Sequence, residues 1–73
     1  MYRLYVEQNG KVIADFYRDG NVDAYYKFSQ MFHDAEIGDI VIWEDEESGA
    51  VIAKIMVIIH GLQNGLMALL IRR

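Results

Sequence analysis

The residue types best suited to acid–base or metal chemistry lie in one short run near the middle of the chain. His33 and Asp34 are followed by Glu36 and Asp39. His33 and Glu36 are three positions apart, so on a helix they would share a face. A zinc site needs three or four ligands, and nothing in the sequence brings His60 to this pair. The polar end of a helix explains the run more simply, with a weak metal-dependent enzyme at His33/Glu36 as an alternative.

A second run of reactive side chains is acidic and lies beside the only tryptophan. Trp43 is followed by four consecutive carboxylates, Glu44, Asp45, Glu46 and Glu47, and then by Ser-Gly. A calcium-binding loop alternates its ligands along the chain, and this run does not. Adjacent carboxylates repel one another, and a basic partner would relieve that repulsion. We expect a solvated turn between two strands, with contact to a basic protein surface as the functional alternative.

The sequence contains few side chains that could act as a catalytic nucleophile. There is no cysteine or threonine, and the two serines, Ser29 and Ser48, lie outside any nucleophile-elbow motif. The glycines fall at expected element boundaries and form no phosphate-binding loop. We therefore expect a protein that is not an enzyme and that needs no cofactor. The absence of cysteine fits a reducing compartment, and we expect a cytoplasmic location.

Composition points to a partner. A domain of 73 residues buries only about 60% of the surface of its unfolded chain, yet 53% of the residues are hydrophobic. We expect some apolar surface to face another chain. The net charge of −4 disfavours direct binding of nucleic acid, which uses clustered Lys and Arg. Residues 51–71 contain no acid, but Asn64-Gly65 indicates a turn, so we expect no membrane span.

Periodicity predicts the elements that must position these residues. Residues 2–7 and 11–18 alternate as strands around Asn9-Gly10, a strong hairpin signal. Apolar residues at helical spacing predict a helix over residues 22–35, capped by Asp19 or Asn21 and ended by Gly38. Residues 39–44 and 50–59 read as a second hairpin. Residues 66–71 fit either a helix or a fifth strand.

This order predicts one α+β domain over residues 1–73. A mostly antiparallel sheet in ββαββ order would carry the helix on one face. The core side of the helix would hold Ala24, Phe28, Met31, Phe32 and Ala35, with Tyr25 at its edge. The sheet face opposite the helix would carry Tyr5, Ile13, Tyr17, Val41 and Trp43, unless the strand register is the opposite one. The outer side of the helix would expose Val22, Tyr26, Ser29 and His33.

These surfaces predict a small acidic, non-catalytic protein–protein interaction module. It would occupy a basic surface of another protein, such as a nucleic-acid-binding groove, in the manner of phage-type inhibitors by analogy. Tyrosine and tryptophan are enriched at interface centres, and opposite charges speed encounter. The candidate partner-binding residues are Tyr5, Tyr17, Tyr26, His33, Trp43, Glu44, Asp45, Glu46 and Glu47. The alternative is a self-associating structural subunit, a homodimer through the apolar sheet face or an edge strand.

Overall fold

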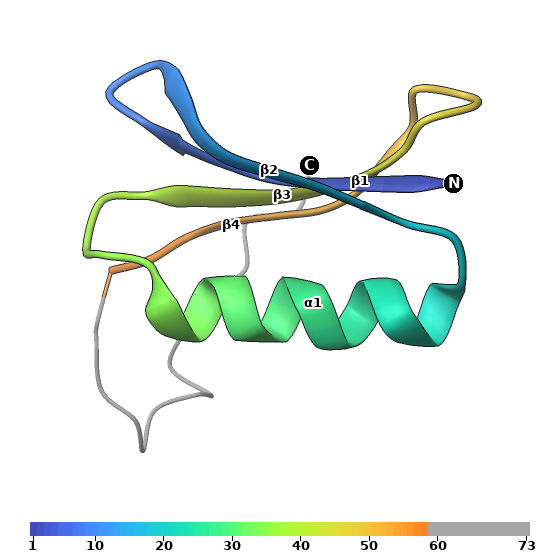
Figure 1. Cartoon of the computed structure of the whole chain (residues 1–73). Coiled ribbons are helices and arrows are strands. Elements are labelled where there is room, and N and C mark those ends of the chain that lie inside the picture. Colours follow the sequence, from blue (N-terminus) through green and yellow to red (C-terminus); the bar gives the residue numbers. More distant parts are fainter. Residues whose placement is uncertain (59–73) are drawn as a thin grey trace.

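The computed structural model describes residues 1–58 and confirms the ββαββ order (Figure 1). The elements are β1 (Tyr2–Gln8), β2 (Lys11–Arg18), α1 (Asn21–Asp34), β3 (Ile40–Asp45) and β4 (Val51–Met56). The four strands form one antiparallel sheet in the order β2-β1-β3-β4, and α1 lies across one face of it. The predicted C-terminal element, residues 66–71, lies outside the described residues.

The first hairpin turns where the sequence predicts, and its second strand carries an irregularity. Asn9 and Gly10 both have positive φ, 53° and 81°, as a type I′ turn requires. Val6 pairs with Ala14 and Glu7 with Val12, so the register shifts and Ile13 is an extra residue. Such a bulge bends the strand and re-aims its side chains. The simple alternation expected for residues 11–18 therefore fails at this point.

Helix α1 forms where the apolar spacing predicts it, with different boundaries. Its N-cap is Gly20, which makes no side-chain cap, so the expectation that Asp19 or Asn21 caps the helix was wrong. The backbone carbonyl of Gly20 instead accepts the Ala24 N–H at 2.9 Å. The helix ends at Asp34, because Ala35 has extended backbone angles, and Gly38 lies in the loop that follows.

The core lies between α1 and the sheet. Ala24, Phe28, Met31 and Ala35 of the helix segment are buried, as predicted, and Phe32 is partly buried. From the sheet side, the buried residues are Leu4, Val6, Val41, Trp43 and Val57. The placement of Val41 and Trp43 on the face opposite α1 was therefore wrong. Trp43 pairs with Leu4 and Val41 with Val6, and directly paired residues share a sheet face.

The loop from α1 to β3 is fixed by a buried carboxylate. Asp39 is 3% exposed. One of its oxygens accepts the Gln8 Nε2–H at 3.1 Å, and the other accepts the Glu36 backbone N–H at 3.0 Å. The Asp39 carbonyl also accepts the Val57 N–H at 2.9 Å. The buried carboxylate therefore ties the loop to β1, and the backbone carbonyl ties it to the residue that follows β4.

Candidate protein-interaction surface

Aromatic side chains run from the core to the surface near the amino end of α1. The ring of Trp43, 9% exposed, has its centroid 6.0 Å from Tyr2, 5.7 Å from Phe28 and 6.4 Å from Tyr25. Tyr25 in turn lies 5.9 Å from Tyr26. Tyr25 and Tyr26 are 55% and 67% exposed. Trp43 is therefore not a contact residue of an open sheet face, but it supports the exposed tyrosines from below.

The indole of Trp43 carries one polar group without a partner among the described residues. Its Nε1–H is buried and has no hydrogen-bond acceptor there. An unpaired buried donor costs about 1–3 kcal/mol. The packing of the indole against the rings of Tyr2, Tyr25 and Phe28 offsets such a cost.

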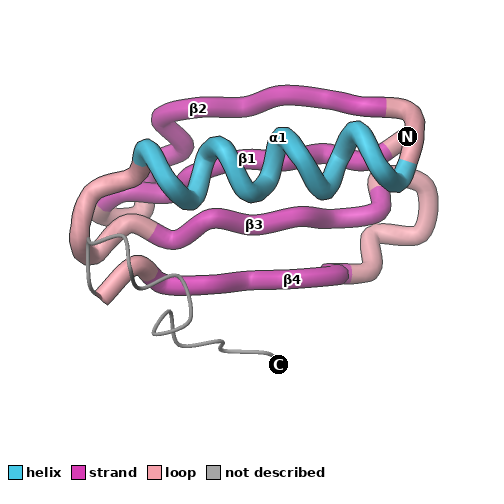
Figure 2. Tube along the Cα trace, turned by 90° about the horizontal axis from the view of Figure 1, so that it is seen from below, coloured by secondary structure: helices cyan, strands magenta, loops and turns pink. Residues whose placement is uncertain are grey.

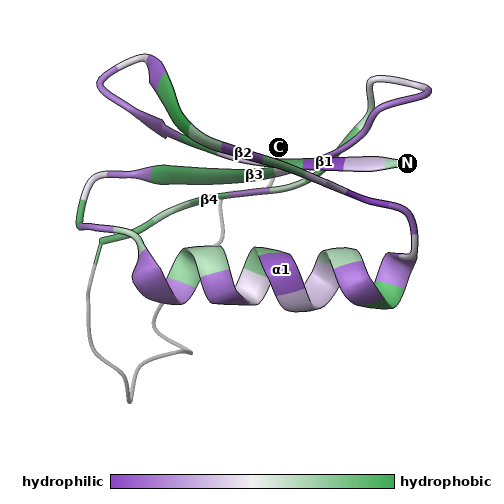
Figure 3. Ribbon diagram, in the orientation of Figure 1, coloured by the Kyte–Doolittle hydropathy of each residue, from purple (hydrophilic) through white to green (hydrophobic). Residues whose placement is uncertain are grey.

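The outer side of α1 is exposed as the sequence predicts. Val22, Tyr26, Ser29 and His33 all face solvent, with Val22 at 65%. Figure 3 shows hydrophilic and hydrophobic residues alternating along α1, whereas β3 carries a continuous hydrophobic stretch. Val22, Tyr25 and Tyr26 give the first turns of α1 an apolar surface that the described chain leaves open. Tyr25 was expected at the edge of the core, and it contacts the buried Trp43 ring while 55% of its surface stays exposed.

The four consecutive carboxylates do not form one cluster at a turn. Glu44 and Asp45 belong to β3, and of the four only Glu46 and Glu47 lie in the turn and are exposed. Glu44 accepts a hydrogen bond from the Tyr5 hydroxyl at 3.0 Å. Asp45 accepts the Glu47 backbone N–H at 3.0 Å and so shapes the turn. The expectation of a solvated acidic turn is confirmed for Glu46 and Glu47 alone.

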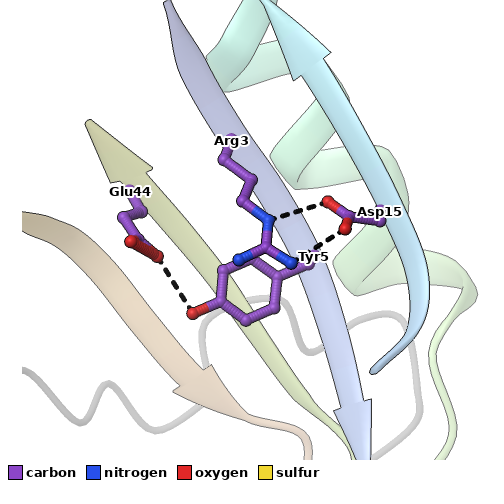
Figure 4. Close-up of polar contacts among 4 residues, drawn as sticks. All are labelled: Arg3, Tyr5, Asp15 and Glu44. Atoms are coloured by element: carbon purple, nitrogen blue, oxygen red, sulfur yellow. Dashed lines mark hydrogen bonds and ion pairs between the residues drawn. The ribbon is translucent and has the colours of Figure 1, made fainter. Parts of the chain in front are cut away.

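The sheet face opposite α1 carries Tyr5 and Tyr17, as predicted, but Tyr5 is engaged within the chain (Figure 4). Arg3 donates from Nε and Nη2 to the two carboxylate oxygens of Asp15 at 2.9 and 2.8 Å. The same guanidinium lies 4.0 Å from the centroid of the Tyr5 ring. The Tyr5 hydroxyl then donates to Glu44. These four residues form a polar array across three strands.

Electrostatics within the polar array follow these contacts. The hydrogen bond from Arg3 lowers the pKa of Asp15, and the same bond raises the pKa of Arg3. Burial, and then the hydrogen bond to Glu44, raise the pKa of Tyr5.

Ile42 pairs with Tyr5 on this face and is only 2% exposed. Of the predicted sheet-face contacts, Tyr17, at 43% exposure, is the aromatic ring that stays open.

The positions of Ile13 and of Glu36, which was expected to share a helix face with His33, also differ from the sequence-based predictions. Ile13 lines a hollow on the α1 side of the sheet, with Ala14 and Phe16, because of the bulge in β2. Glu36 follows the end of α1, so it does not share a helix face with His33. Within residues 1–58, no group of three or more His, Cys, Asp or Glu side chains is placed to hold a metal ion.

Comparisons with protein-family models, with curated proteins and with solved structures found no match to this chain. None of the helices in the described part of the chain has the length and apolar character needed to cross a membrane.

Two exposed features lie at the same end of the molecule. Figures 1 and 2 place the β3–β4 turn and the amino end of α1 together at this end, on either side of the sheet. The apolar side chains come from the first turns of α1, and the exposed carboxylates come from the turn and from the start of the helix. We call this set the aromatic–acidic end: Asp19, Val22, Asp23, Tyr25, Tyr26, Glu46 and Glu47.

Proposed function

We propose that this protein is a small acidic interaction module without catalytic activity, which binds a basic surface of another protein through its aromatic–acidic end. The observation that carries the proposal is the exposure of Val22, Tyr25 and Tyr26, each more than half accessible, on one short stretch of α1. Tyrosines supported by a rigid core are typical anchors at interface centres. Here Trp43 supplies that support, since its ring contacts Tyr25.

The charge of the chain supports a basic partner. The sequence holds eleven acidic and seven basic side chains, and all eleven acids lie within the described residues. Asp19 and Asp23 are exposed next to the apolar residues of α1 in the sequence, and Glu46 and Glu47 are exposed at the same end of the molecule, across the sheet (Figure 1). Carboxylates at the rim of an interface raise the rate of encounter with a basic surface, and buried aromatic contacts slow dissociation. The two groups of residues would therefore affect different rate constants.

One concrete form of the proposal is an inhibitor that blocks a nucleic-acid-binding groove of its partner in the cytoplasm. Such a groove is basic, because it binds phosphates. An acidic module could occupy it in place of nucleic acid. A partner of this kind would be released from its nucleic acid when the module is added, with a midpoint that shifts with salt.

The proposal is tested by capture from the native host with the tagged protein and its variants. Tyr26→Ala combined with Val22→Ser should abolish retention of the partner while leaving the urea midpoint unchanged. Glu46→Gln combined with Glu47→Gln should lower the association rate about tenfold and reduce its salt dependence. Ile37→Ala is a matched control, since Ile37 is 62% exposed but follows the carboxyl end of α1. Equal retention by all variants would refute the proposal.

Self-association is the second candidate, and exposed apolar residues on β2 and β4, the outer strands of the sheet within residues 1–58, favour it. Val12 is 46% exposed on β2, and Val51 and Ile52 are 51% and 45% exposed on β4. Exposed apolar edge strands pair readily between copies. Sedimentation at tens of micromolar distinguishes the two candidates, because a homodimer has twice the monomer mass. If the wild-type chain is a dimer and the Tyr26→Ala variant is a monomer, the partner at the aromatic–acidic end is a second copy of this chain.

A further inference from the structure

A second surface lies between the carboxyl half of α1 and strand β2. It is a hollow of about 330 Å³. Its floor is apolar, formed by Val6, Ala14 and Met31, and its walls include Ile13 and Phe16, which are 51% and 36% exposed. The residues of the aromatic–acidic end do not line it. A depression with an apolar floor beside a strand suits side chains of an extended segment better than a flat contact.

The charge around this hollow is negative at one end. Asp34, Glu36 and Asp39 line it, against a single cation, Lys27. Lys27 lies at the other end, with Nζ 3.9 Å from the Phe16 ring centroid and donating to Gln30 at 3.2 Å. The Asp39 carboxylate is occupied by Gln8 and by the Glu36 N–H. Within residues 1–58, the carboxylates of Asp34 and Glu36 make no ion pair, and both residues are exposed.

The position of these acids goes against the helix dipole. Asp34 is the last residue of α1, and Glu36 follows two residues later. The carboxyl end of a helix is its negative end, where cations are favoured and carboxylates are not. A cation bound between Asp34 and Glu36 would offset both the mutual repulsion and the unfavourable dipole. Breaks in a local rule of this kind tend to occur at functional sites.

Strand β2 gives the hollow a backbone edge. Among the described strands β2 lies at one side of the sheet, and Figure 2 shows it lying outside α1. After the irregularity at Ile13, residues 14–18 pair regularly with β1. The outward N–H and C=O groups of an edge strand can pair with an added strand. Alternate side chains of that strand would point toward the α1 side of the sheet, where the hollow opens.

We propose that this hollow is a docking groove for an extended, basic segment of a protein partner. The backbone of the segment pairs with residues 14–18 of β2. An apolar side chain of the segment fills the space between Phe16 and Met31, and a lysine or arginine lies between Asp34 and Glu36. The groove is separate from the aromatic–acidic end, so it stands or fails independently of the function proposed above.

The test uses a short fluorescein-labelled peptide in which valine and arginine alternate, with fluorescence anisotropy as the readout. The wild-type chain should bind it at low salt. Asp34→Asn combined with Glu36→Gln should weaken binding about tenfold, the loss expected for one charge-assisted contact. Glu46→Gln combined with Glu47→Gln removes the same charge elsewhere and should change affinity by less than about twofold. Equal weakening by the two double variants would overturn the proposal, because it would show non-specific attraction.

Further measurements distinguish strand pairing in the hollow from binding of free amines and from binding at the aromatic–acidic end. The same peptide with alternate backbone nitrogens methylated cannot pair with a strand, and it should bind about tenfold more weakly. Equal binding of the methylated peptide would refute strand addition. If spermidine displaces the peptide at a concentration equal to that of the peptide, the hollow is a site for free amines and not for an extended protein segment. Tyr26→Ala should leave peptide binding unchanged, and loss of binding in that variant would move the peptide to the aromatic–acidic end.

Discussion

The ion pair between Arg3 and Asp15 allows a quantitative test of the polar array. Its side chains are 28% and 37% exposed, so solvent screens the pair and limits its contribution. Exposed pairs give about 0.2–1 kcal/mol, and the two-oxygen geometry places this one in the upper half of that range. We expect a coupling of about 0.5–1 kcal/mol between Arg3→Gln and Asp15→Asn. Arg3→Gln alone should destabilise more than Asp15→Asn alone, since it also removes the contact with the Tyr5 ring.

The measurement is a double-mutant cycle by urea unfolding. Trp43 is the only tryptophan and is buried, so its fluorescence reports the unfolding transition. Four proteins are compared at neutral pH, at low salt and in 1 M NaCl. The coupling should fall in high salt, because the Debye length shortens to about 3 Å.

The pH dependence of stability tests whether the Arg3–Asp15 pair stabilises the fold in the expected direction. Since Arg3 lowers the pKa of Asp15, the pair stabilises the fold above the ordinary carboxyl pKa of about 4. That contribution is lost as the pH falls from about 4 through the lowered pKa. The difference in unfolding free energy between wild type and Asp15→Asn should therefore shrink in this window. A coupling near zero at neutral pH and low salt, or one that grows as the pH falls, would refute the reasoning.

Three further predictions address the core, the helix and Tyr5. Leu4→Ala should destabilise by about 2–5 kcal/mol, because Leu4 is fully buried, whereas exposed Val12→Ala should change stability by less than about 0.5 kcal/mol in urea unfolding. Gly20→Ser should raise the thermal midpoint by the equivalent of a few tenths of a kcal/mol, since the N-cap lacks a side-chain acceptor and has room for one. Tyr5 should ionise above the ordinary tyrosine pKa of about 10 in an ultraviolet titration against Tyr5→Phe. Its raised pKa means that this part of the stability is present below pH 10 and is lost above it.

Much of the fold follows from local patterns. Asn9-Gly10 and the alternation on either side predict the first hairpin because the turn needs positive φ at both positions. The spacing of Ala24, Phe28 and Met31 predicts the buried side of α1 for the same kind of local reason. The exposure of Val22 and Tyr26 then follows from the period of the helix, so the part of the candidate site that lies on α1 was predictable from the sequence.

The placement of Trp43 could not be predicted in the same way. Strand β3 is apolar at four consecutive positions, residues 40–43, so alternation does not say which pair faces α1. That choice is made by pairing with β1, where Leu4 lies opposite Trp43. The position of Ile13 depends on a bulge, which leaves no clear signal in a continuous β pattern. Both errors therefore come from tertiary pairing.

The polar array occupies the side chains that a partner on this sheet face would need. An open sheet face with free tyrosines would have been the natural interface, and the sequence contains the residues for one. In the folded chain Arg3 lies over Tyr5 and is held by Asp15, while Glu44 accepts the Tyr5 hydroxyl. A partner that used Tyr5 would have to break these contacts, whereas Val22 and Tyr26 are exposed without any such rearrangement. Weakening the array with Asp15→Asn should consequently leave partner binding at the aromatic–acidic end unaffected.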